Sequence, residues 1–383
     1  MQDWVTSLKL NGDFRGRFEG FYSDNPAFVD RNRWRYRLRV GLAATIKDDL
    51  EVGIRLASGE VNGDPISTNQ TLQDNGSKKP VTIDLAYAKW SPISTPDWAG
   101  SFTFGKMENP FVLSDMLFDG DYTPEGAAQQ LSYNLGASQA LKLNLGEFIL
   151  DELGASSKDP YLVGAQLRLE STWTPKLASS LGVGFLSILG EESLPSSAVP
   201  DVNRGNRRNV ASATSLTYPA AGFDTLVADG ALTYTLDSFP HYPGPFPIKL
   251  FGEWLHNGSA DGQNDGYHVG LALGKSGKKG AWDISYRWKE LGGDAWWEEL
   301  ADSDFGAYYQ DSLAAPLPKT ARTYNGGYFA GTNVRGHIVK ASYSPFDSLT
   351  LGVTWFSTSL IEEYKPGTHS GMNRLQVDAM YKF

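Results

Sequence analysis

Two rows of arginine could form a strongly basic surface within the first sixty residues. Every second residue from position 33 to position 39 is arginine, and three further arginines lie in neighbouring segments with the same alternation. Guanidinium groups bind carboxylates and phosphates, and rings of basic side chains are typical of anion-selective passages. The seven candidates are Arg15, Arg17, Arg33, Arg35, Arg37, Arg39 and Arg55.

The segment 107–126 carries a second group of charges, of the opposite sign. It is unusually apolar for a water-exposed loop, with Phe111, Leu117 and Phe118 among its residues, so it needs a surface against which to bury these side chains. We expect it to fold inward, facing the arginines across a narrow, wet passage whose transverse field favours polar solutes. The alternative is a surface lid, with the arginines paired to acids of their own wall. The acids of the segment are Glu108, Asp115, Asp119, Asp121 and Glu125.

The arginines must be held on one face of long strands. From Leu8 to Ile46, two runs alternate strictly between apolar and polar residues, which is typical of strands with two unlike faces. The runs exceed the usual globular strand length and suit tilted strands that cross a bilayer. An arginine on the lipid side costs roughly 2–4 kcal/mol at the bilayer midplane, so the arginine face must meet water inside a barrel.

The rest of the chain continues this rhythm and predicts an all-β fold, a transmembrane antiparallel β-barrel of sixteen strands. Short turns alternate with long polar loops, as periplasmic turns and extracellular loops do in outer-membrane barrels. We expect a single domain, 1–383, whose third loop is folded into the lumen and forms a constriction at about 107–126. A barrel of sixteen strands is too wide for its side chains to fill and keeps an aqueous channel. The strands are expected near 8–22, 33–46, 49–57, 81–90, 100–106, 127–135, 140–150, 161–173, 179–189, 223–236, 247–256, 267–274, 281–289, 333–344, 348–357 and 372–383.

Composition excludes several other classes. The chain has no cysteine and no apolar stretch long enough for a transmembrane helix, and its net charge of −10 argues against a nucleic-acid partner. We expect a mature chain, because no signal peptide is apparent at its start. Five scattered histidines suggest no catalytic residues and no metal site, and the calcium-like stretch 261–266 has Ala272 where an EF-hand needs an acid. We therefore expect no enzyme activity and no cofactor.

Four stretches resemble the bacterial "putative porin" family of outer-membrane channels: 10–19, 31–39, 67–72, and 105–111 with 119–121 and 124–126. Phe383 also resembles the C-terminal aromatic residue by which barrel-assembly machinery recognises outer-membrane proteins. The motifs lie in the first third of the chain. The resemblance implies passive diffusion through the outer membrane of a Gram-negative bacterium, an inward third loop and a homotrimer, but no particular solute.

The sequence thus predicts an outer-membrane porin that is surrounded by lipid and passes small hydrophilic solutes or ions. Two alternatives stay open. One is an anion- or substrate-selective channel that uses the arginine wall, and the other is a surface-binding barrel whose lumen is plugged.

Overall fold

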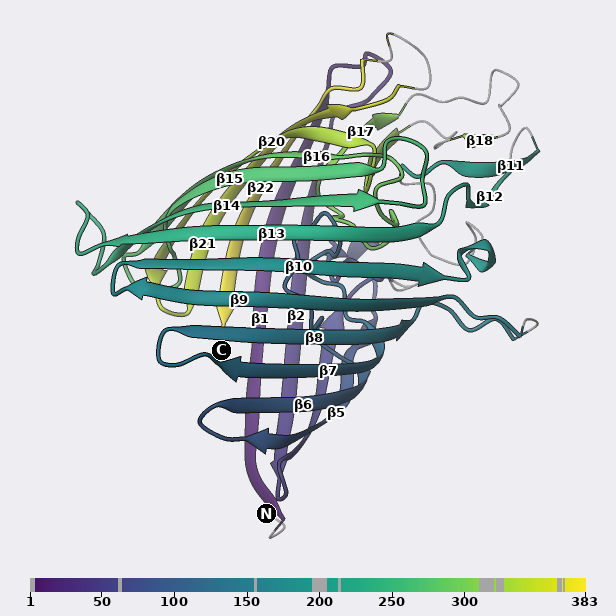
Figure 1. The fold of residues 1–383 in the computed structure, drawn as a ribbon. Coiled ribbons are helices and arrows are strands. Elements are labelled where there is room, and N and C mark those ends of the chain that lie inside the picture. Colours follow the sequence, from purple (N-terminus) through teal and green to yellow (C-terminus); the bar gives the residue numbers. More distant parts are fainter. Residues whose placement is uncertain are drawn as a thin grey trace.

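The computed structural model describes residues 4–60, 64–154, 157–194, 205–212, 215–309, 320–321, 327–363, 367 and 369–383. Its main sheet has 17 strands, of which one, β4 (Gln70–Thr71), is a two-residue piece of a loop. The other sixteen form a closed antiparallel barrel, because β22 pairs back with β1 (Figure 1). The prediction of a sixteen-stranded barrel is confirmed. Its strands are β1 (Val5–Ser23), β2 (Arg31–Ile46), β3 (Leu50–Ser58), β5 (Val81–Ser94), β6 (Trp98–Lys106), β7 (Glu125–Asn134), β8 (Gln139–Ile149), β9 (Tyr161–Thr174), β10 (Leu177–Leu189), β13 (Phe223–Leu236), β14 (Phe246–Asn257), β15 (Asp265–Gly274), β16 (Trp282–Leu291), β20 (Val334–Phe346), β21 (Leu349–Leu360) and β22 (Met372–Lys382).

The alternation in the sequence separates an apolar outer face from a polar inner face. On β1, Leu10 is 67% exposed on the outside, whereas Arg17 on the other face is 5% exposed. Large apolar side chains are exposed in the same way along β2, β6, β15 and β21. Soluble proteins rarely expose an apolar surface of this extent, and a lipid-facing wall requires one.

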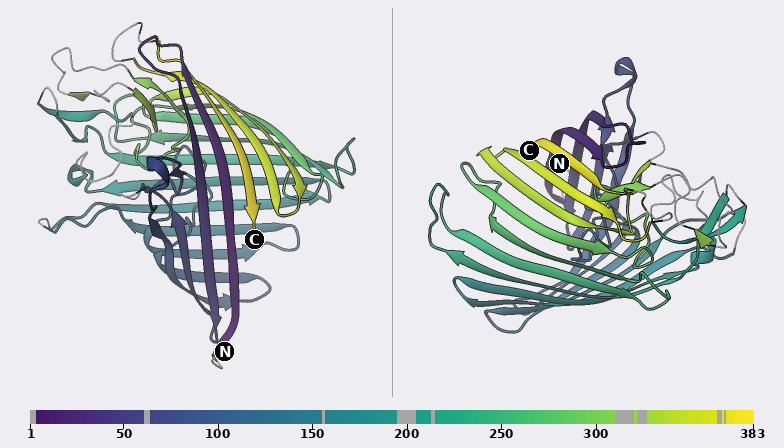
Figure 2. Two further views of the ribbon diagram at one scale, coloured as in Figure 1. Left: turned by 180° about the vertical axis from the view of Figure 1, so that it is seen from behind. Right: turned by 90° about the horizontal axis from the view of Figure 1, so that it is seen from above.

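The connections also alternate as expected. Short turns join β2 to β3, β7 to β8 and β9 to β10, while the longer connections gather at the opposite end of the barrel (Figure 2). The two ends of the chain lie near the turns: the Gly12 N–H donates to the Phe383 carbonyl at 2.9 Å, and the Lys47 N–H donates to the Trp4 carbonyl at 3.0 Å.

One strand runs further than the sequence indicated. β5 continues through Pro92 to Ser94, although the strand was expected to end near residue 90. The register shifts between Trp90 and Ile93, so the proline sits at a bulge, where the missing N–H breaks no regular ladder bond.

The loops contain short elements of their own. β4 extends the sheet beside the upper part of β2, with Thr71 opposite Arg35. β11 (Arg208–Ser212), β12 (Ser215–Pro219) and β18 (Thr320–Ala321) form one small sheet, and β17 (Gly306–Tyr309) pairs with β19 (Gly327–Ala330). The helical turns η1 (Asp74–Gly76) and η2 (Glu191–Ser193) are brief. None of the described residues forms a helix long and apolar enough to cross a membrane.

The largest apolar core lies inside the barrel wall. Met116, Leu117 and Phe118 of the connection between β6 and β7 pack with Trp296 and Trp297 of the connection that follows β16. Inward-facing residues of the wall, from β7 to β16, complete this core, among them Phe148, Leu162, Val227 and Leu255. Two connections therefore fold into the lumen, and their apolar side chains are buried there.

Candidate functional site in the barrel lumen

The pairing of β1 with β2 sets arginines directly opposite one another on the inner face. Arg15 is the partner of Arg37, and Arg17 is the partner of Arg35. Like charges opposite each other in a sheet destabilise it, and the low dielectric constant of a buried site strengthens the repulsion. This arrangement therefore depends on carboxylates supplied by other parts of the chain.

Five carboxylates lie among the guanidinium groups of β1 and β2. Two belong to β1 itself, one comes from β22, and two come from the inward connections. Each carboxylate contacts at least one arginine within 4 Å, so most of the positive charge of this wall is compensated. The ion pairs are Arg37–Asp13 (2.8 Å), Arg39–Asp13 (2.7 Å), Arg37–Asp121 (3.0 Å), Arg39–Asp121 (3.4 Å), Arg17–Asp378 (2.7 Å), Arg17–Asp304 (3.1 Å), Arg17–Glu19 (3.5 Å), Arg33–Glu19 (2.5 Å) and Arg35–Glu19 (3.8 Å).

Four of these arginines are covered. Arg15, Arg17, Arg35 and Arg37 are between 5% and 9% exposed. Arg15 Nη2 donates to Asn69 Oδ1 at 2.6 Å, and Arg35 Nη2 donates to the Asn69 carbonyl at 3.3 Å, so the connection before β5 also reaches this wall. The expectation that all seven arginines face open water was therefore too broad. Those that keep more exposure are Arg33, Arg39 and Arg55, whose side chains are 20%, 18% and 14% exposed.

The segment 107–124 crosses the inside of the barrel. Its Val112 N–H donates to Gln166 Oε1 on β9 at 2.9 Å, and its Ser114 N–H donates to Glu253 Oε2 on β14 at 2.9 Å. Asp115 then reaches β16, where its Oδ1 accepts from Arg287 at 3.0 Å and from Lys289 at 3.1 Å. The segment returns to the first strands through Asp121, so it contacts both the β9–β16 side and the β1–β2 side.

The five acids predicted in this segment have different surroundings. Asp115 and Asp121 form the ion pairs described above, and Asp119 accepts backbone hydrogen bonds in the interior. Glu108 pairs with Arg55, which also binds Asp84, and its side chain is 65% exposed. Glu125 does not lie inside the barrel with the other four acids.

The placement of Glu125 in the constriction was wrong. Glu125 is the first residue of β7, opposite Lys106, the last residue of β6. Phe104, two residues before Lys106, is 63% exposed on the outer face, so the alternation turns Lys106 and Glu125 outward as well. The two form an ion pair of 3.0 Å on the outside of the wall.

A second inward connection, 292–305, was missed from the sequence. Trp296 is fully buried and donates from Nε1 to the Leu117 carbonyl at 2.7 Å, and the Asp119 N–H donates to the Leu300 carbonyl at 2.8 Å. Asp304 of the same connection binds Arg17 and Arg374. The signal was present in the sequence, because this loop contains the same kind of apolar run that marked the third loop.

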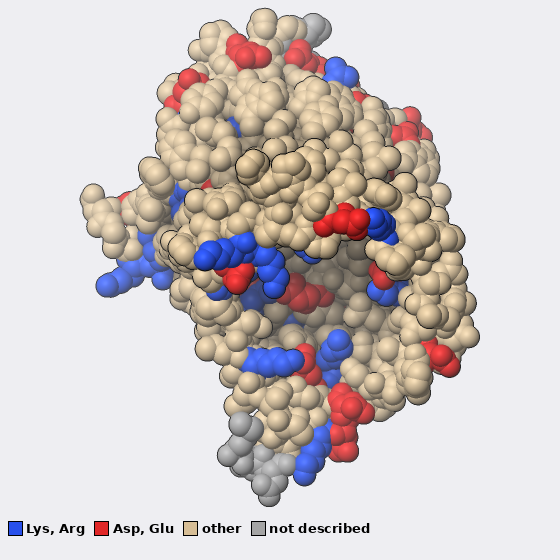
Figure 3. Space-filling model, turned by 90° about the vertical axis from the view of Figure 1, so that its left-hand side faces the viewer, with Lys and Arg blue, Asp and Glu red and all other residues tan. Residues whose placement is uncertain are grey.

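Both signs of charge border the open end of the lumen. Figure 3 looks at the end that carries the short turns and shows a hollow with basic and acidic side chains around it and within it. Inward-facing pairs near this end include Lys142–Glu170, with side chains 39% and 44% exposed. The hollow is therefore wet and of mixed charge, which suits polar solutes.

Asp119 lies at the junction of the two inward connections. Its Oδ1 accepts from the Asp121 N–H and its Oδ2 from the Ser303 N–H, both at 2.8 Å. Burial, together with the charges of Asp121 and Asp302, raises the pKa of Asp119 well above its usual range. An acid whose pKa is raised on folding stabilises the folded state below its unfolded pKa, and this stabilisation is lost as the pH rises through the folded pKa.

We therefore expect acidification from about pH 8 to about pH 4 to strengthen the packing of the two connections. The pKa values of Asp115, Asp121 and Asp304 are lowered by their basic partners, so their stabilisation is lost only at pH values below this window. Thermal unfolding of the detergent-solubilised chain across the window measures the effect. In Asp119→Asn the pH dependence should be flatter; an unchanged profile would contradict the assignment.

The described residues contain no cluster of three or more His, Cys, Asp or Glu side chains able to hold a metal ion. His268 is buried on the inner face, whereas His256 Nδ1 lies 3.0 Å from Asp265 near the strand ends. Asp265 is the first residue of β15. The two histidines therefore do not form a site together.

Comparisons with known proteins agree with this geometry. Residues 25–198 match the model of the family described as "Putative porin". A comparison with curated proteins finds no match. The fold is similar to Pseudomonas putida OprB at high pH, with 10% identity, coverage of 98% of this chain and 94% of the other, and a TM-score of 0.55. It is also similar to Salmonella typhi OmpF in complex with daunomycin, with 10% identity, coverage of 98% and 97%, and a TM-score of 0.51.

A mutant porin of Rhodopseudomonas blastica aligns over 98% of this chain and 100% of its own length, at 11% identity and a TM-score of 0.45. The family match confirms the resemblance predicted from the sequence over residues 25–198. At 10% identity, the likeness to OprB and OmpF establishes the barrel fold alone.

Proposed function

We propose that this chain, which matches the "Putative porin" family over residues 25–198, is an outer-membrane porin for the passive diffusion of small hydrophilic solutes and ions. The observation that carries the proposal is the segment 107–124, which crosses a closed sixteen-stranded barrel and is tied at both sides by ion pairs. Such a barrel keeps an aqueous channel, and an inward segment narrows it. We propose this segment as the constriction.

The charges of the passage favour polar solutes and ions of either charge. The arginines of β1 and β2 are largely paired with carboxylates, so they hold the inward segments in place more than they present free positive charge. Glu108, Arg39 and Arg55 keep exposure and can meet solutes. Paired charges of both signs orient dipolar solutes and disfavour apolar ones.

One observation favours the anion-selective alternative. Among the described residues Arg15 has no carboxylate within 4.0 Å; its direct partner is the neutral Asn69 amide oxygen, and Asp378 and Asp121 act on its charge only from a longer distance. An unpaired guanidinium in a site of low dielectric constant attracts anions. The plugged-barrel alternative is favoured by the apolar core around Trp296, which occupies part of the lumen.

We further propose that the chain resides in the outer membrane of a Gram-negative bacterium, surrounded by lipid, and assembles as a homotrimer. The exposed apolar wall supports the membrane location. A passive channel needs neither a catalytic residue nor a cofactor, and we assign none.

Single-channel current in a planar bilayer tests the proposal. A stable conductance under a KCl gradient is expected, and silence from folded, inserted protein would favour the plugged barrel. The reversal potential then measures how much Arg15 contributes to the preference for anions. Arg15→Ala should shift the selectivity towards cations. Arg335→Ala, which removes the same charge near the outer loop end of β20, is the control and should leave the potential unchanged. Equal shifts in the two variants would exclude a special role for Arg15.

A further inference from the structure

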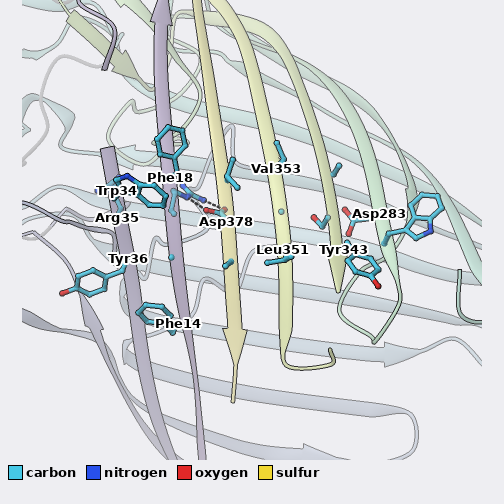
Figure 4. Close-up of a pocket in the computed structure, with 18 of the residues that line it drawn as sticks. Phe14, Phe18, Trp34, Arg35, Tyr36, Asp283, Tyr343, Leu351, Val353 and Asp378 are labelled. Atoms are coloured by element: carbon cyan, nitrogen blue, oxygen red, sulfur yellow. Dashed lines mark hydrogen bonds and ion pairs between the residues drawn. The ribbon is translucent and has the colours of Figure 1, made fainter. Parts of the chain in front are cut away.

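A solute in the passage meets the inner face of the barrel wall. A large depression of about 990 Å³ lies on the outer face instead, across β16, β20, β21, β22, β1 and β2. Figure 4 shows Phe14, Phe18, Trp34 and Tyr36, the aromatic side chains at one side of it. The sheet separates this depression from the passage, so it does not bind solutes that cross the membrane.

A second depression, about 720 Å³, lies on the inner face close to the turns. It follows the turn-side ends of β7, β8, β9, β10, β13 and β14, and the turn between β7 and β8 borders it. Ala140, Ala178 and Ala231 form its floor, and such small side chains leave room above the sheet. This end of the barrel is the one that Figure 3 shows, so solutes reach the depression from water.

Lys249 supplies an unpaired positive charge in this depression. Glu253, four residues further along β14, binds Ser114 inside the barrel, so the strand alternation turns Lys249 inward as well. The Lys249 ammonium lies 5.5 Å from the centre of the Phe251 ring. Among the described residues it has no carboxylate within 4.0 Å, and its side chain is exposed. It is therefore free to bind an anion.

Three hydroxyl groups in the same depression have no partner of their own. Arg168 of β9 and Asp229 of β13 pair inside the barrel at 2.7 Å. Thr172 and Thr233 each lie four residues further towards the turns on these strands, so both face the lumen. Ser180 of β10, the strand between them, lines the same depression. Within the part of the chain that the structure describes, none of the three side-chain hydroxyls forms a hydrogen bond.

The carboxylates of the depression leave the charge of Lys249 uncompensated. Glu170 binds Lys142 at 2.6 Å, so its charge is already balanced. Asp97 lies next to the end of β7, where the Asn134 N–H donates to its carbonyl. From β7 to β14 the sheet passes through β8, β9, β10 and β13, which is about 24 Å along the wall at about 4.8 Å per strand. The part of the depression between β9 and β14 therefore attracts anions.

These groups match a small carboxylate that also carries hydroxyl groups. An ammonium forms charge-assisted hydrogen bonds with a carboxylate, and the hydroxyls of serine and threonine both donate and accept, as alcohols do. Thr233 is directly opposite Lys249 in the pairing of β13 with β14, and Thr172 lies two strands further. The span from β9 to β14 is about 14 Å along the sheet, which is enough for a chain of about six carbons between the side chains. An inorganic anion would use Lys249 alone and leave the hydroxyls to water.

We propose that this stretch of the inner wall binds small polyhydroxylated carboxylates, with the Lys249 ammonium on the carboxylate and the three hydroxyls on the alcohol groups of the solute. The inference rests on the proposed channel function and names a solute class for it. Glu253, which holds the segment 107–124, lies four residues above Lys249, or about 9 Å for a strand tilted by about 45°. The site therefore lies beside the proposed constriction, on its turn side, where binding raises the local concentration of the solute.

Single-channel recordings with gluconate test the site. Gluconate added to the KCl solution, on each side of the bilayer in turn, should interrupt the current in a concentration-dependent way. Lys249→Met removes a charge-assisted hydrogen bond and should raise the concentration for half block by about tenfold. Sorbitol, which has the same six-carbon chain without the carboxylate, should block only weakly.

Lys340→Met is the matched control and should leave the block by gluconate unchanged. Lys340 lies on β20, outside the depression, and faces inward like Ile338, which packs in the interior. Three results would overturn the site: an equal block in Lys249→Met and the wild type, an equal loss of block in Lys249→Met and Lys340→Met, or a block by sorbitol as strong as that by gluconate.

Saturation-transfer NMR of gluconate with the detergent-solubilised full chain separates the site from the channel, because it needs no current. Signals that Lys249→Met abolishes support the site even where the wild type is silent in bilayers, a silence that overturns the proposed channel. Absent signals overturn the site whether or not the channel conducts.

A second variant tests the hydroxyl groups. Thr172→Val with Thr233→Val keeps the size of both side chains and removes their hydroxyls, so the block by gluconate should weaken by about fivefold. The block by propionate, a carboxylate without hydroxyls, should stay unchanged. Equal changes for both solutes would show that the hydroxyls do not select the solute, and the proposed solute class would then be wrong.

Discussion

Replacing Glu19 by glutamine is expected to destabilise the barrel by about 3–5 kcal/mol, the usual cost of removing one partner from a buried ion pair. Glu19 is fully buried, and its Oε1 accepts from Arg374 at 2.6 Å and from Gln376 at 3.1 Å. Its Oε2 accepts from Arg33 at 2.5 Å. One carboxylate thus joins β1 to β2 and to β22, where the barrel closes.

The loss is large because the guanidinium groups stay buried after the substitution. An amide carries no charge, so Arg33 and Arg35 lose the carboxylate that compensates them, whereas Arg374 keeps its ion pair with Asp304. Denaturant titration of the refolded barrel measures the change in the free energy of unfolding. The control is Glu170→Gln, which makes the same change in a pair with Lys142 where both side chains are well exposed. Exposed pairs contribute about 0–1 kcal/mol, so equal losses in the two variants would contradict the role of Glu19.

The strands could be predicted because their pattern is local. The alternation within residues 8–22 and 33–46 requires no knowledge of the rest of the chain, and it decides both the strands and the face that meets lipid. The inward fold of the third loop was expected for the same reason, from apolar residues such as Leu117 in a connection. The same reasoning applied to Trp296 and Trp297 would have found the second inward connection.

The partners of the arginines could not be predicted in this way. Arg17 binds Asp378, which is 361 residues away in the sequence, and Asp304, which is 287 residues away. These contacts exist only because the barrel closes and because a loop after β16 folds inward. Strand periodicity fixes which face an arginine lies on, but it does not show which distant carboxylates cover it.

The case of Glu125 shows that an error of two residues in a strand boundary can change the function assigned to a residue. The predicted loop, 107–126, ends two residues beyond the observed one, because β7 begins at Glu125. Once a residue belongs to a strand, the alternation decides its face, and Glu125 moves from the lumen to the outer wall. Asp115, Asp119 and Asp121 contact groups inside the barrel, and their role in a constriction stays a prediction.

Truncating Trp296 to alanine is expected to have the largest effect on the passage itself. The side chain is fully buried, and its ring lies 5.8 Å from that of Phe118 in a T-shaped contact. Its indole N–H donates a hydrogen bond to the Leu117 carbonyl. Removing a buried tryptophan typically costs about 3–5 kcal/mol. Trp296 also contacts Phe223 at the start of β13, so the cost falls on the interior core that joins the two inward connections to the wall. The backbone pairing of the wall strands does not depend on the Trp296 side chain.

The Trp296→Ala barrel should therefore still form, while the segment 107–124 is held less firmly and the single-channel conductance rises and becomes noisier. Planar-bilayer recordings measure the conductance, and resistance to unfolding in detergent reports on the wall. Trp173→Ala is the matched control, because Trp173 is 59% exposed at the turn end of β9 and makes no contact with either connection. If Trp296→Ala conducts like the wild type, the two connections do not control the width of the passage, and the constriction must be sought among the exposed charges of the wall.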